Sequence, residues 1–106
     1  MSNTSQSIRD AAQKAILFTP HAISQMTAAD RLITPDEVVG VVQRGEIIED
    51  YPHDRRGHSC LLLGTGHNGR SLHVVCAPKK DHLTIITAYI PDVDFWEEAF
   101  RKRIQS

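Results

Sequence analysis

Residues 58–77 read HSCLLLGTGHNGRSLHVVCA and contain two apolar runs on either side of a glycine-rich turn. The runs His58–Thr65 and Arg70–Ala77 are short and rich in Leu and Val, which predicts two strands. Asn68-Gly69 between them is the preferred pair for a two-residue type I′ turn, because both positions need positive φ. The sequence therefore predicts an antiparallel hairpin at the centre of the fold.

The turn decides which side chains share a face of this hairpin. With Asn68-Gly69 as the turn, the numbers of paired residues add to 137. One face then carries five apolar side chains and is expected to pack on helices: Leu61, Leu63, Leu72, Val74 and Cys76. Cys60 and Cys76 fall on opposite faces, so no disulfide between them is expected. A bulge at Gly64 or Gly66 would shift every face by one residue.

Three helices are predicted before the hairpin. Their ranges are Ile8–Leu17, Pro20 to about Ala29 and Pro35 to about Arg44. Thr34 and Glu37 form a capping box around Pro35, and Gly45 ends the third helix. Residues 1–7 are polar and are expected to fray.

The remaining segments complete the predicted fold. The four strands are Glu46–Tyr51, His58–Thr65, Arg70–Ala77 and His82–Ile90. A last helix is predicted from Pro91-Asp92, because acidic residues come first, basic residues come last, and Val93, Trp96, Phe100 and Ile104 share a face. We expect an α+β fold with N-terminal helices followed by a four-stranded antiparallel meander and a C-terminal helix.

Composition indicates one small intracellular domain over residues 1–106. The chain has a net charge of −1 and 41% hydrophobic residues, which is ordinary for a globular protein. Its longest apolar stretch, Leu83–Ile90, is too short to span a bilayer, and the N-terminus lacks the pattern of a secretory signal. Two cysteines without such a signal suggest reduced thiols. We expect a cytoplasmic protein that does not engage membranes.

The charges are unevenly distributed along the chain. Residues 55–80 contain five Lys and Arg and no acid, together with three histidines. This stretch is either a solvated set of loops or a surface that binds anions such as phosphate.

The sequence also contains residues that could bind a metal ion. The candidate ligands are His53, His58 and Cys60, with His73 and Cys76 as additions. Zinc needs three or four ligands around one point, and no paired cysteine or histidine spacing is present. Because the expected register also separates Cys60 from Cys76, we expect neither a metal nor another cofactor.

His21 is a candidate for acid–base chemistry. As the second residue of a helix it lies at the positive end of the dipole, which favours the neutral, basic imidazole. Thr87 and Tyr89 are two residues apart on a strand and share a face. The alternative is that His21 is an ordinary surface residue and that Thr87 and Tyr89 pack at a strand end.

Scattered segments of the chain resemble the bacterial domain of unknown function 4258 over about residues 18–103. They are Pro20-His21-Ala22, Met26, Arg31-Leu32-Ile33-Thr34, Glu37-Val38-Val39, Gly45-Glu46-Ile47-Ile48, Arg70-Ser71-Leu72-His73-Val74-Val75 and Ile85-Ile86-Thr87-Ala88-Tyr89, followed by Pro91 and Trp96. That family is similar, more distantly, to the barnase–EndoU–colicin–RelE group of small metal-independent ribonucleases. Those proteins place N-terminal helices before a four-stranded antiparallel sheet.

The resemblance implies a set of site residues. The polar positions of the family match His21, Arg31, His73, Thr87 and Tyr89. We expect His21, Arg31, Thr87 and Tyr89 to meet in one cleft, with the basic 70–80 hairpin at its rim, and we rank His73 below them. Phosphate or nucleic acid is expected at three further residues: Arg70, Lys79 and Lys80.

Two functions follow from this set. The first is a metal-independent, toxin-like endoribonuclease, in which His21 or His73 transfers protons, Arg31 holds phosphate and Tyr89 stacks on a base. The chain lacks the His-Lys or Glu-Arg-His sets of the better-known ribonucleases. The second is a non-catalytic module that binds protein or nucleic acid through the same surface; a domain that binds zinc or a small ligand is a weaker alternative. The expected partners are RNA and a cognate inhibitor protein.

Overall fold

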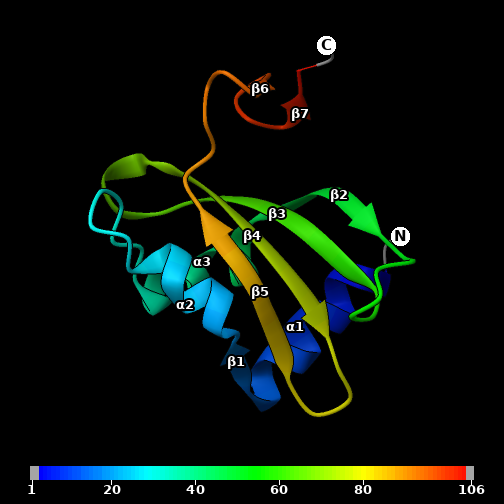
Figure 1. The fold of residues 1–106 in the computed structure, drawn as a ribbon. Coiled ribbons are helices and arrows are strands. Elements are labelled where there is room, and N and C mark those ends of the chain that lie inside the picture. Colours follow the sequence, from blue (N-terminus) through cyan, green and yellow to red (C-terminus); the bar gives the residue numbers. More distant parts are fainter. Residues whose placement is uncertain (1–2, 105–106) are drawn as a thin grey trace.

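The computed structural model describes residues 3–104, which form an α+β fold (Figure 1). The helices are α1 (Asn3–Lys14), α2 (Pro20–Met26), α3 (Pro35–Arg44) and a 3₁₀ turn, η1 (His67–Gly69). The strands are β1 (Ile16–Phe18), β2 (Glu46–Tyr51), β3 (Ser59–Thr65), β4 (Ser71–Pro78), β5 (Leu83–Tyr89), β6 (Trp96–Glu97) and β7 (Lys102–Arg103). None of the described helices is long and apolar enough to cross a membrane.

The main sheet has five strands in the order β1-β5-β4-β3-β2, so the prediction of a four-stranded antiparallel meander is wrong. Strand β1 pairs in parallel with β5, from Ile16 opposite Leu83 to Phe18 opposite Ile85. The sequence pattern predicts Ile16 and Leu17 as the end of the first helix instead. The helix ends earlier, at Lys14, because Thr19-Pro20 favours an extended chain before the proline and the apolar run of β1 completes the sheet.

The first turns of the chain also differ from expectation. Residues 3–7 belong to α1 rather than fraying, and residues 1–2 lie outside the described residues. Helix α3 agrees with the prediction in full. Thr34 Oγ1 accepts a hydrogen bond from the Glu37 amide at 3.1 Å, Glu37 Oε1 accepts one from the Thr34 amide at 3.0 Å, and Gly45 is the C-cap.

The predicted C-terminal helix is absent from residues 91–104, which form turns and the short β6–β7 hairpin. Three consecutive residues, Glu98, Ala99 and Phe100, have positive φ, which a right-handed helix excludes. The apolar spacing that predicted the helix is not used as one face. Trp96 is buried, whereas Val93 and Ile104 are exposed.

The β3–β4 hairpin has a different register from the one predicted. The Gly66 amide donates to the Arg70 carbonyl at 2.8 Å, so three residues, 67–69, form the turn. Asn68 and Gly69 do have positive φ, 59° and 75°, but His67 adds one residue to the connection. Cys60 therefore lies opposite Cys76.

This one-residue shift exchanges the two faces of β3, whereas Leu72, Val74 and Cys76 of β4 face the helices as predicted. The side chains that pack under the helices are Cys60, Leu62, Leu72, Val74 and Cys76. The prediction that Leu61 and Leu63 face the helices and that Cys60 and Cys76 point apart is wrong, because side chains alternate strictly along a strand. Both cysteines are free thiols.

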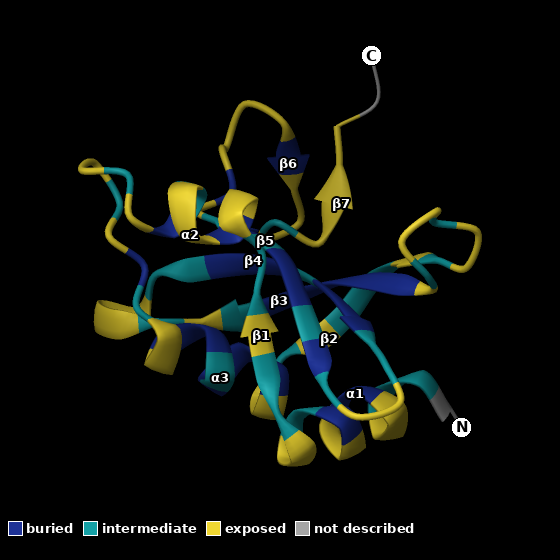
Figure 2. Ribbon diagram, turned by 60° about the horizontal axis from the view of Figure 1, so that its bottom comes forward, coloured by how far each residue is buried: buried dark blue, intermediate teal, exposed yellow. Residues whose placement is uncertain are grey.

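The sheet lies between two layers in Figure 2, with α1 and α3 on one side and the β6–β7 hairpin on the other. We call the side of α1 and α3 the helix face and the other side the outer face. Helix α2 packs along β5, since Thr19 Oγ1 donates to the Ile86 carbonyl at 2.8 Å. The core lies on the helix face, where α3 covers β3 and β4, and α1 covers β4 and β5.

Candidate functional site

The outer face brings two of the predicted site residues into contact. His73 lies opposite Tyr89 across β4 and β5, with Nδ1 3.2 Å from the tyrosine hydroxyl. The two strands shift register by one residue at Ile86, between the pairs Cys76–Ile85 and Val75–Thr87. Val75 and Thr87 form the next pair on the same face, so His73, Thr87 and Tyr89 share one surface.

The β6–β7 hairpin buries His73 completely. The indole ring of Trp96 packs edge-on against the imidazole with centroids 4.4 Å apart. His73 Nε2 lies 2.8 Å from the Phe100 carbonyl oxygen, so both ring nitrogens have partners. Burial lowers the pKa of His73 and favours its neutral form. This histidine is therefore a structural group without access to solvent.

Ion pairs fix the hairpin on the outer face. Arg103 donates to Glu49 at 2.8 Å and lies 4.7 Å from the centroid of the Trp96 ring. Arg101 pairs with Glu46 at 2.8 Å. Two acids of β2, Glu46 and Glu49, thus bind Arg101 and Arg103. The hairpin that covers His73 is therefore attached to β2 as well as to β4.

His21 and Thr87 lie on neighbouring segments. The Thr19 side chain caps α2 by accepting from the Ala22 amide at 3.0 Å and donates to the carbonyl of Ile86, the residue before Thr87. His21 is exposed at the start of this helix. The structure thus gives His21 a place beside β5.

Arg31 and Arg70 contact each other at the far end of the β3–β4 hairpin. Arg70 Nη1 donates to the Arg31 carbonyl at 2.8 Å, and Arg70 Nε and Nη2 donate to Glu37 at 3.0 and 2.7 Å. The Glu37 carboxylate is buried, and these hydrogen bonds lower its pKa to about 2. The Arg31 side chain contacts Gln25 and Asp30. The Arg70 guanidinium is therefore engaged within the fold.

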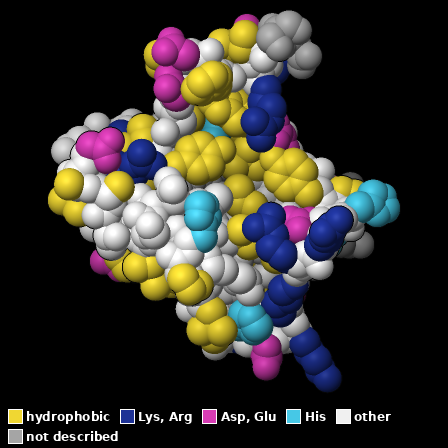
Figure 3. Space-filling view, in the orientation of Figure 1, with side chains coloured by type: hydrophobic (Ala, Val, Ile, Leu, Met, Phe, Trp, Pro, Cys, Tyr) yellow, Lys and Arg dark blue, Asp and Glu magenta, His cyan; other side chains and the backbone are white. Residues whose placement is uncertain are grey.

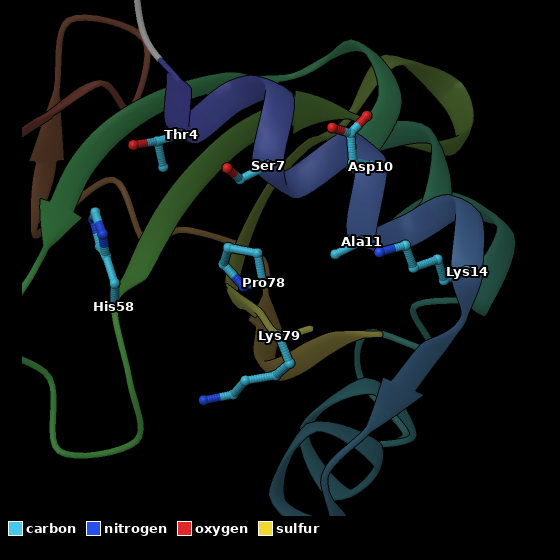
Figure 4. A pocket seen from close by; sticks show the side chains of 8 residues that line it. All are labelled: Thr4, Ser7, Asp10, Ala11, Lys14, His58, Pro78 and Lys79. Carbon is cyan, nitrogen blue, oxygen red and sulfur yellow. The ribbon is translucent and has the colours of Figure 1, made fainter. Parts of the chain in front are cut away.

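A large hollow lies between α1 and the ends of β3 and β4, on the helix face (Figure 4). It has a volume of about 540 Å³, and we call it the basic hollow. Its lining residues are Thr4, Ser7, Asp10, Ala11, Lys14, His58, Pro78 and Lys79. Figure 4 shows the α1 side chains along one wall and His58, Pro78 and Lys79 along the other. Its rim therefore carries two ammonium groups, an imidazole and two hydroxyls against one carboxylate.

Contacts between loops bring further cations to this end of the molecule. Lys79 Nζ donates to the Arg56 carbonyl, which joins the β4–β5 turn to the 52–58 loop. Lys14 Nζ donates to the Lys80 carbonyl at 2.9 Å, which joins α1 to the same turn. Figure 3 shows dark blue side chains gathered over these loops, at the lower right. Arg56 is paired with Asp54 at 2.9 Å.

Four cations at this end have no carboxylate partner within the described part of the chain. They are Lys14, Arg55, Lys79 and Lys80. We call them the basic cluster. The basic stretch of the sequence is thus divided in the structure: Lys79 and Lys80 belong to this cluster, whereas Arg70 lies with Glu37.

Asp50, His58 and Cys60 meet beside the basic hollow. His58 Nε2 lies 2.5 Å from Asp50 Oδ1, and Cys60 Sγ lies 3.3 Å from the same oxygen. The hydrogen bond from His58 lowers the pKa of Asp50, and burial raises the pKa of the Cys60 thiol to about 12. Among the described residues this is the group that offers three ligand atoms close together, all within 4.8 Å of one another.

Two residues of these sites, Lys14 and Asp50, were not predicted from the sequence. Lys14 could have been found, because Thr4, Ser7, Ala11 and Lys14 recur at helical spacing and so share a face of α1. Asp50 required the pairing of β2 with β3, which places it opposite Cys60 and which a one-residue error moves to the other face.

The chain matches the family model of a domain of unknown function (DUF4258) over residues 18–90. No curated protein and no solved structure matches it significantly, so these comparisons give no support to a similarity with ribonuclease toxins. The matched part runs from the end of β1 to the end of β5 and includes His58, Lys79 and the whole β2–β5 meander. Since the match covers well over half of the 106 residues, the chain belongs to the DUF4258 family of domains of unknown function.

Proposed function

We propose that this protein is a non-catalytic module that binds RNA through the basic cluster around the basic hollow. The observation that carries the proposal is that α1, the 52–58 loop and the β4–β5 turn meet at one end of a chain whose net charge is −1. These segments carry the four residues of the basic cluster: Lys14, Arg55, Lys79 and Lys80. Lysine and arginine without carboxylate partners bind phosphates and release counterions, which favours a polyanion as the ligand.

The surroundings of the cluster fit a nucleic acid better than an acidic protein. The basic hollow adds two hydroxyls, of Thr4 and Ser7, and the imidazole of His58, all of which donate to or accept from phosphate and ribose groups. The volume of about 540 Å³ is large enough for a nucleotide-sized group. Asp10 is the one carboxylate in the lining, and it disfavours a ligand with negative charge on that side.

RNA cleavage is less well supported than binding. Metal-independent cleavage needs an accessible base and acid on either side of the phosphate. His73, which contacts Tyr89, is buried and hydrogen-bonded at both ring nitrogens. On the face that His73, Thr87 and Tyr89 share, His73 is therefore not accessible as the second proton-transfer group beside His21. The catalytic alternative is RNA cleavage in the expected cleft of His21, Arg31, Thr87 and Tyr89. The following experiment distinguishes this cleavage from RNA binding alone.

The test measures the affinity of the full chain for a single-stranded RNA by fluorescence anisotropy at several salt concentrations. We expect Arg55→Glu with Lys80→Glu to weaken binding. The slope of log affinity against log salt should also fall by roughly 0.7 for each phosphate that the variant no longer neutralises. The matched control reverses two exposed cations elsewhere, Arg44→Glu with Lys102→Glu, which gives the same net charge as the first double variant.

Three results would overturn the proposal. They are the absence of salt-dependent RNA binding, an equal loss of affinity in both double variants, and cleavage of the RNA that is lost in His21→Ala. The last result would establish the ribonuclease instead.

A further inference from the structure

We propose that Asp50, His58 and Cys60 form a binding site for a divalent transition-metal ion such as Zn²⁺, with a coordination position open to the basic hollow. The inference does not depend on RNA binding, because its ligand is a metal ion and its ligand set shares only His58 with the lining of the basic hollow. It rests on the backbone register, the distances among three ligand atoms and the burial of each.

The sheet places the three side chains on one face. Asp50 and Cys60 are directly opposite each other in the antiparallel β2–β3 pair. His58 lies at the end of the 52–58 loop, one residue before β3, and its imidazole contacts the Asp50 carboxylate. The backbone hydrogen bonds of the β2–β3 ladder hold Asp50 and Cys60. Ordering two of the three ligands in the sheet reduces the entropy lost on binding.

The distances fit a tetrahedral ion after a small rearrangement. Ligand atoms about 2.0–2.3 Å from one zinc ion lie about 3.3–3.6 Å apart at tetrahedral angles. Cys60 Sγ and Asp50 Oδ1 are 3.3 Å apart, and the three ligand atoms all lie within 4.8 Å of one another. The His58–Asp50 contact of 2.5 Å is a hydrogen bond whose proton the ion would replace, which requires the two groups to separate by about 1 Å.

The donor set selects the class of metal. A thiolate, an imidazole and a carboxylate suit Zn²⁺ and its spectroscopic substitute Co²⁺, whereas Mg²⁺ and Ca²⁺ require oxygen ligands. On binding, the Cys60 thiol releases its proton to solvent. The His58–Asp50 hydrogen bond is replaced by two bonds to the ion, and the neutral imidazole that binds through Nε2 carries its N–H on Nδ1. The positive charge of the ion stabilises the Cys60 thiolate in its buried position.

The site is buried on the side of Cys60 and open to solvent on the side of His58 and Asp50. Cys60 is fully buried, while the side chains of His58 and Asp50 are 42% and 50% exposed. His58 lines the basic hollow, and Asp50 lines a second hollow of about 530 Å³ beside it; Thr4 lines both. Water or an anionic group in the basic hollow would take the fourth position, as in zinc sites that keep an exchangeable ligand.

The ligand set differs from the one that the sequence suggested. The sequence offered His53 with His58 and Cys60, and it predicted no metal because no paired spacing was visible. The structure keeps His58 and Cys60 and supplies Asp50 as the third ligand. His53 is exposed on the 52–58 loop and lies outside the cluster, which makes it a matched control.

The test is a Co²⁺ titration of the full chain after removal of bound metal with a chelator, followed by absorption. We expect one Co²⁺ per chain, a thiolate-to-cobalt charge-transfer band, and displacement of the band by Zn²⁺. His58→Ala and Asp50→Asn should each weaken Co²⁺ binding about tenfold or more, since each removes a ligand. Cys60→Ser should abolish the band, and His53→Ala should leave affinity and band unchanged.

Folding is controlled by circular dichroism of every variant. Because His58 and Asp50 are half exposed, their variants test the site even if Cys60→Ser fails to fold. The proposal is overturned if the unaltered chain shows no charge-transfer band, or if His53→Ala weakens binding as much as His58→Ala. It is also overturned if the band persists at full affinity in Asp50→Asn and His58→Ala, which would mean that the ion binds the thiol elsewhere.

Discussion

Glu37, whose carboxylate is buried, forms an ion pair with Arg70 that joins the start of α3 to the β3–β4 turn, with Arg70 Nη2 2.7 Å from Glu37 Oε1. The other Glu37 oxygen accepts from the His67 amide at 2.7 Å. One carboxylate therefore caps a helix, anchors a turn and holds a guanidinium. Its charge is stabilised by the fold rather than by water.

This pair predicts a loss of stability in acid. The folded protein holds the pKa of Glu37 at about 2, against 4.5 without these partners, chiefly through the hydrogen bond from Arg70. Stability from a depressed carboxyl pKa is complete above about pH 4.5 and is lost as pH falls toward 2, because the unfolded chain takes up the proton first. The contribution is on the order of 3 kcal/mol.

Urea unfolding across this pH range measures the effect. Glu37→Gln should lower the free energy of unfolding at neutral pH by about 3 kcal/mol and should remove most of the acid dependence between about pH 4.5 and 2. Glu97→Gln, at an exposed residue outside the described ion pairs, is the control and should change neither. Parallel pH profiles for Glu37→Gln and the unaltered protein would refute the assignment.

Gly64 provides a direct test of the hairpin register. A Cβ at this position would lie 2.7 Å from Cγ2 of Val41, which belongs to α3. Gly64→Ala should therefore destabilise the fold by about 1–3 kcal/mol, the usual cost of overpacking a core. In the register predicted from the sequence, Gly64 faces away from the helices and the substitution would be harmless. Thr65→Ala, at the exposed neighbour, is the control in chemical unfolding, and equal stability of the two variants would contradict the observed register.

The sequence allowed the positions of most helices and strands to be predicted, but not the pairing of the strands. Helix α3 and strand β2 lie where capping and strand patterns predict them, because those signals are local. The register depends on whether the turn includes His67, and two- and three-residue turns both accept Asn68 and Gly69. Strand β1 was missed because three apolar residues after a helix continue its pattern, and its parallel partner β5 begins only at Leu83.

In the candidate sites, too, residues with local signals were predicted and residues that depend on strand pairing were not. Lys79 and Lys80 were identified from local charge, and the structure places them in the basic cluster. The metal-ligating cluster needed the pairing of β2 with β3, and the burial of His73 needed the path of the C-terminal chain across the outer face. An amphipathic pattern at 93–104 predicted a helix because spacing does not reveal positive φ at Ala99.

Trp96 should control the titration of His73. Burial lowers the pKa of His73, so protonation is resisted in the folded state. Trp96→Ala removes the ring that packs on the imidazole, and the pKa should rise toward its ordinary value as water enters. Histidine NMR titration measures this shift, and Phe95→Ala, at a side chain that is 66% exposed, is the control. An unchanged His73 pKa in Trp96→Ala would mean that the indole ring of Trp96 is not what keeps water away from His73.

Thr19 should fix the position of α2 and hence of His21. Its hydroxyl accepts from the Ala22 amide at 3.0 Å and donates to the Ile86 carbonyl at 2.8 Å. Thr19→Val keeps the side-chain shape but removes both hydrogen bonds, so we expect a loss of about 1–3 kcal/mol in the free energy of unfolding.

The matched control is Thr27→Val at the other end of α2, where the exposed hydroxyl donates to the Ile23 carbonyl within the helix. Its effect should stay within about 0.5 kcal/mol, because it joins no other element. The two variants also separate local capping from attachment to the sheet. Backbone NMR shifts at Ile86 and Thr87 should move in Thr19→Val and stay fixed in Thr27→Val, since the first substitution removes a donor to β5. Unchanged shifts at Thr87 in Thr19→Val would show that Ala22, Met26 and the backbone hydrogen bond from Thr19 to Ile85 suffice to hold α2 on β5, and that the position of His21 does not depend on the cap.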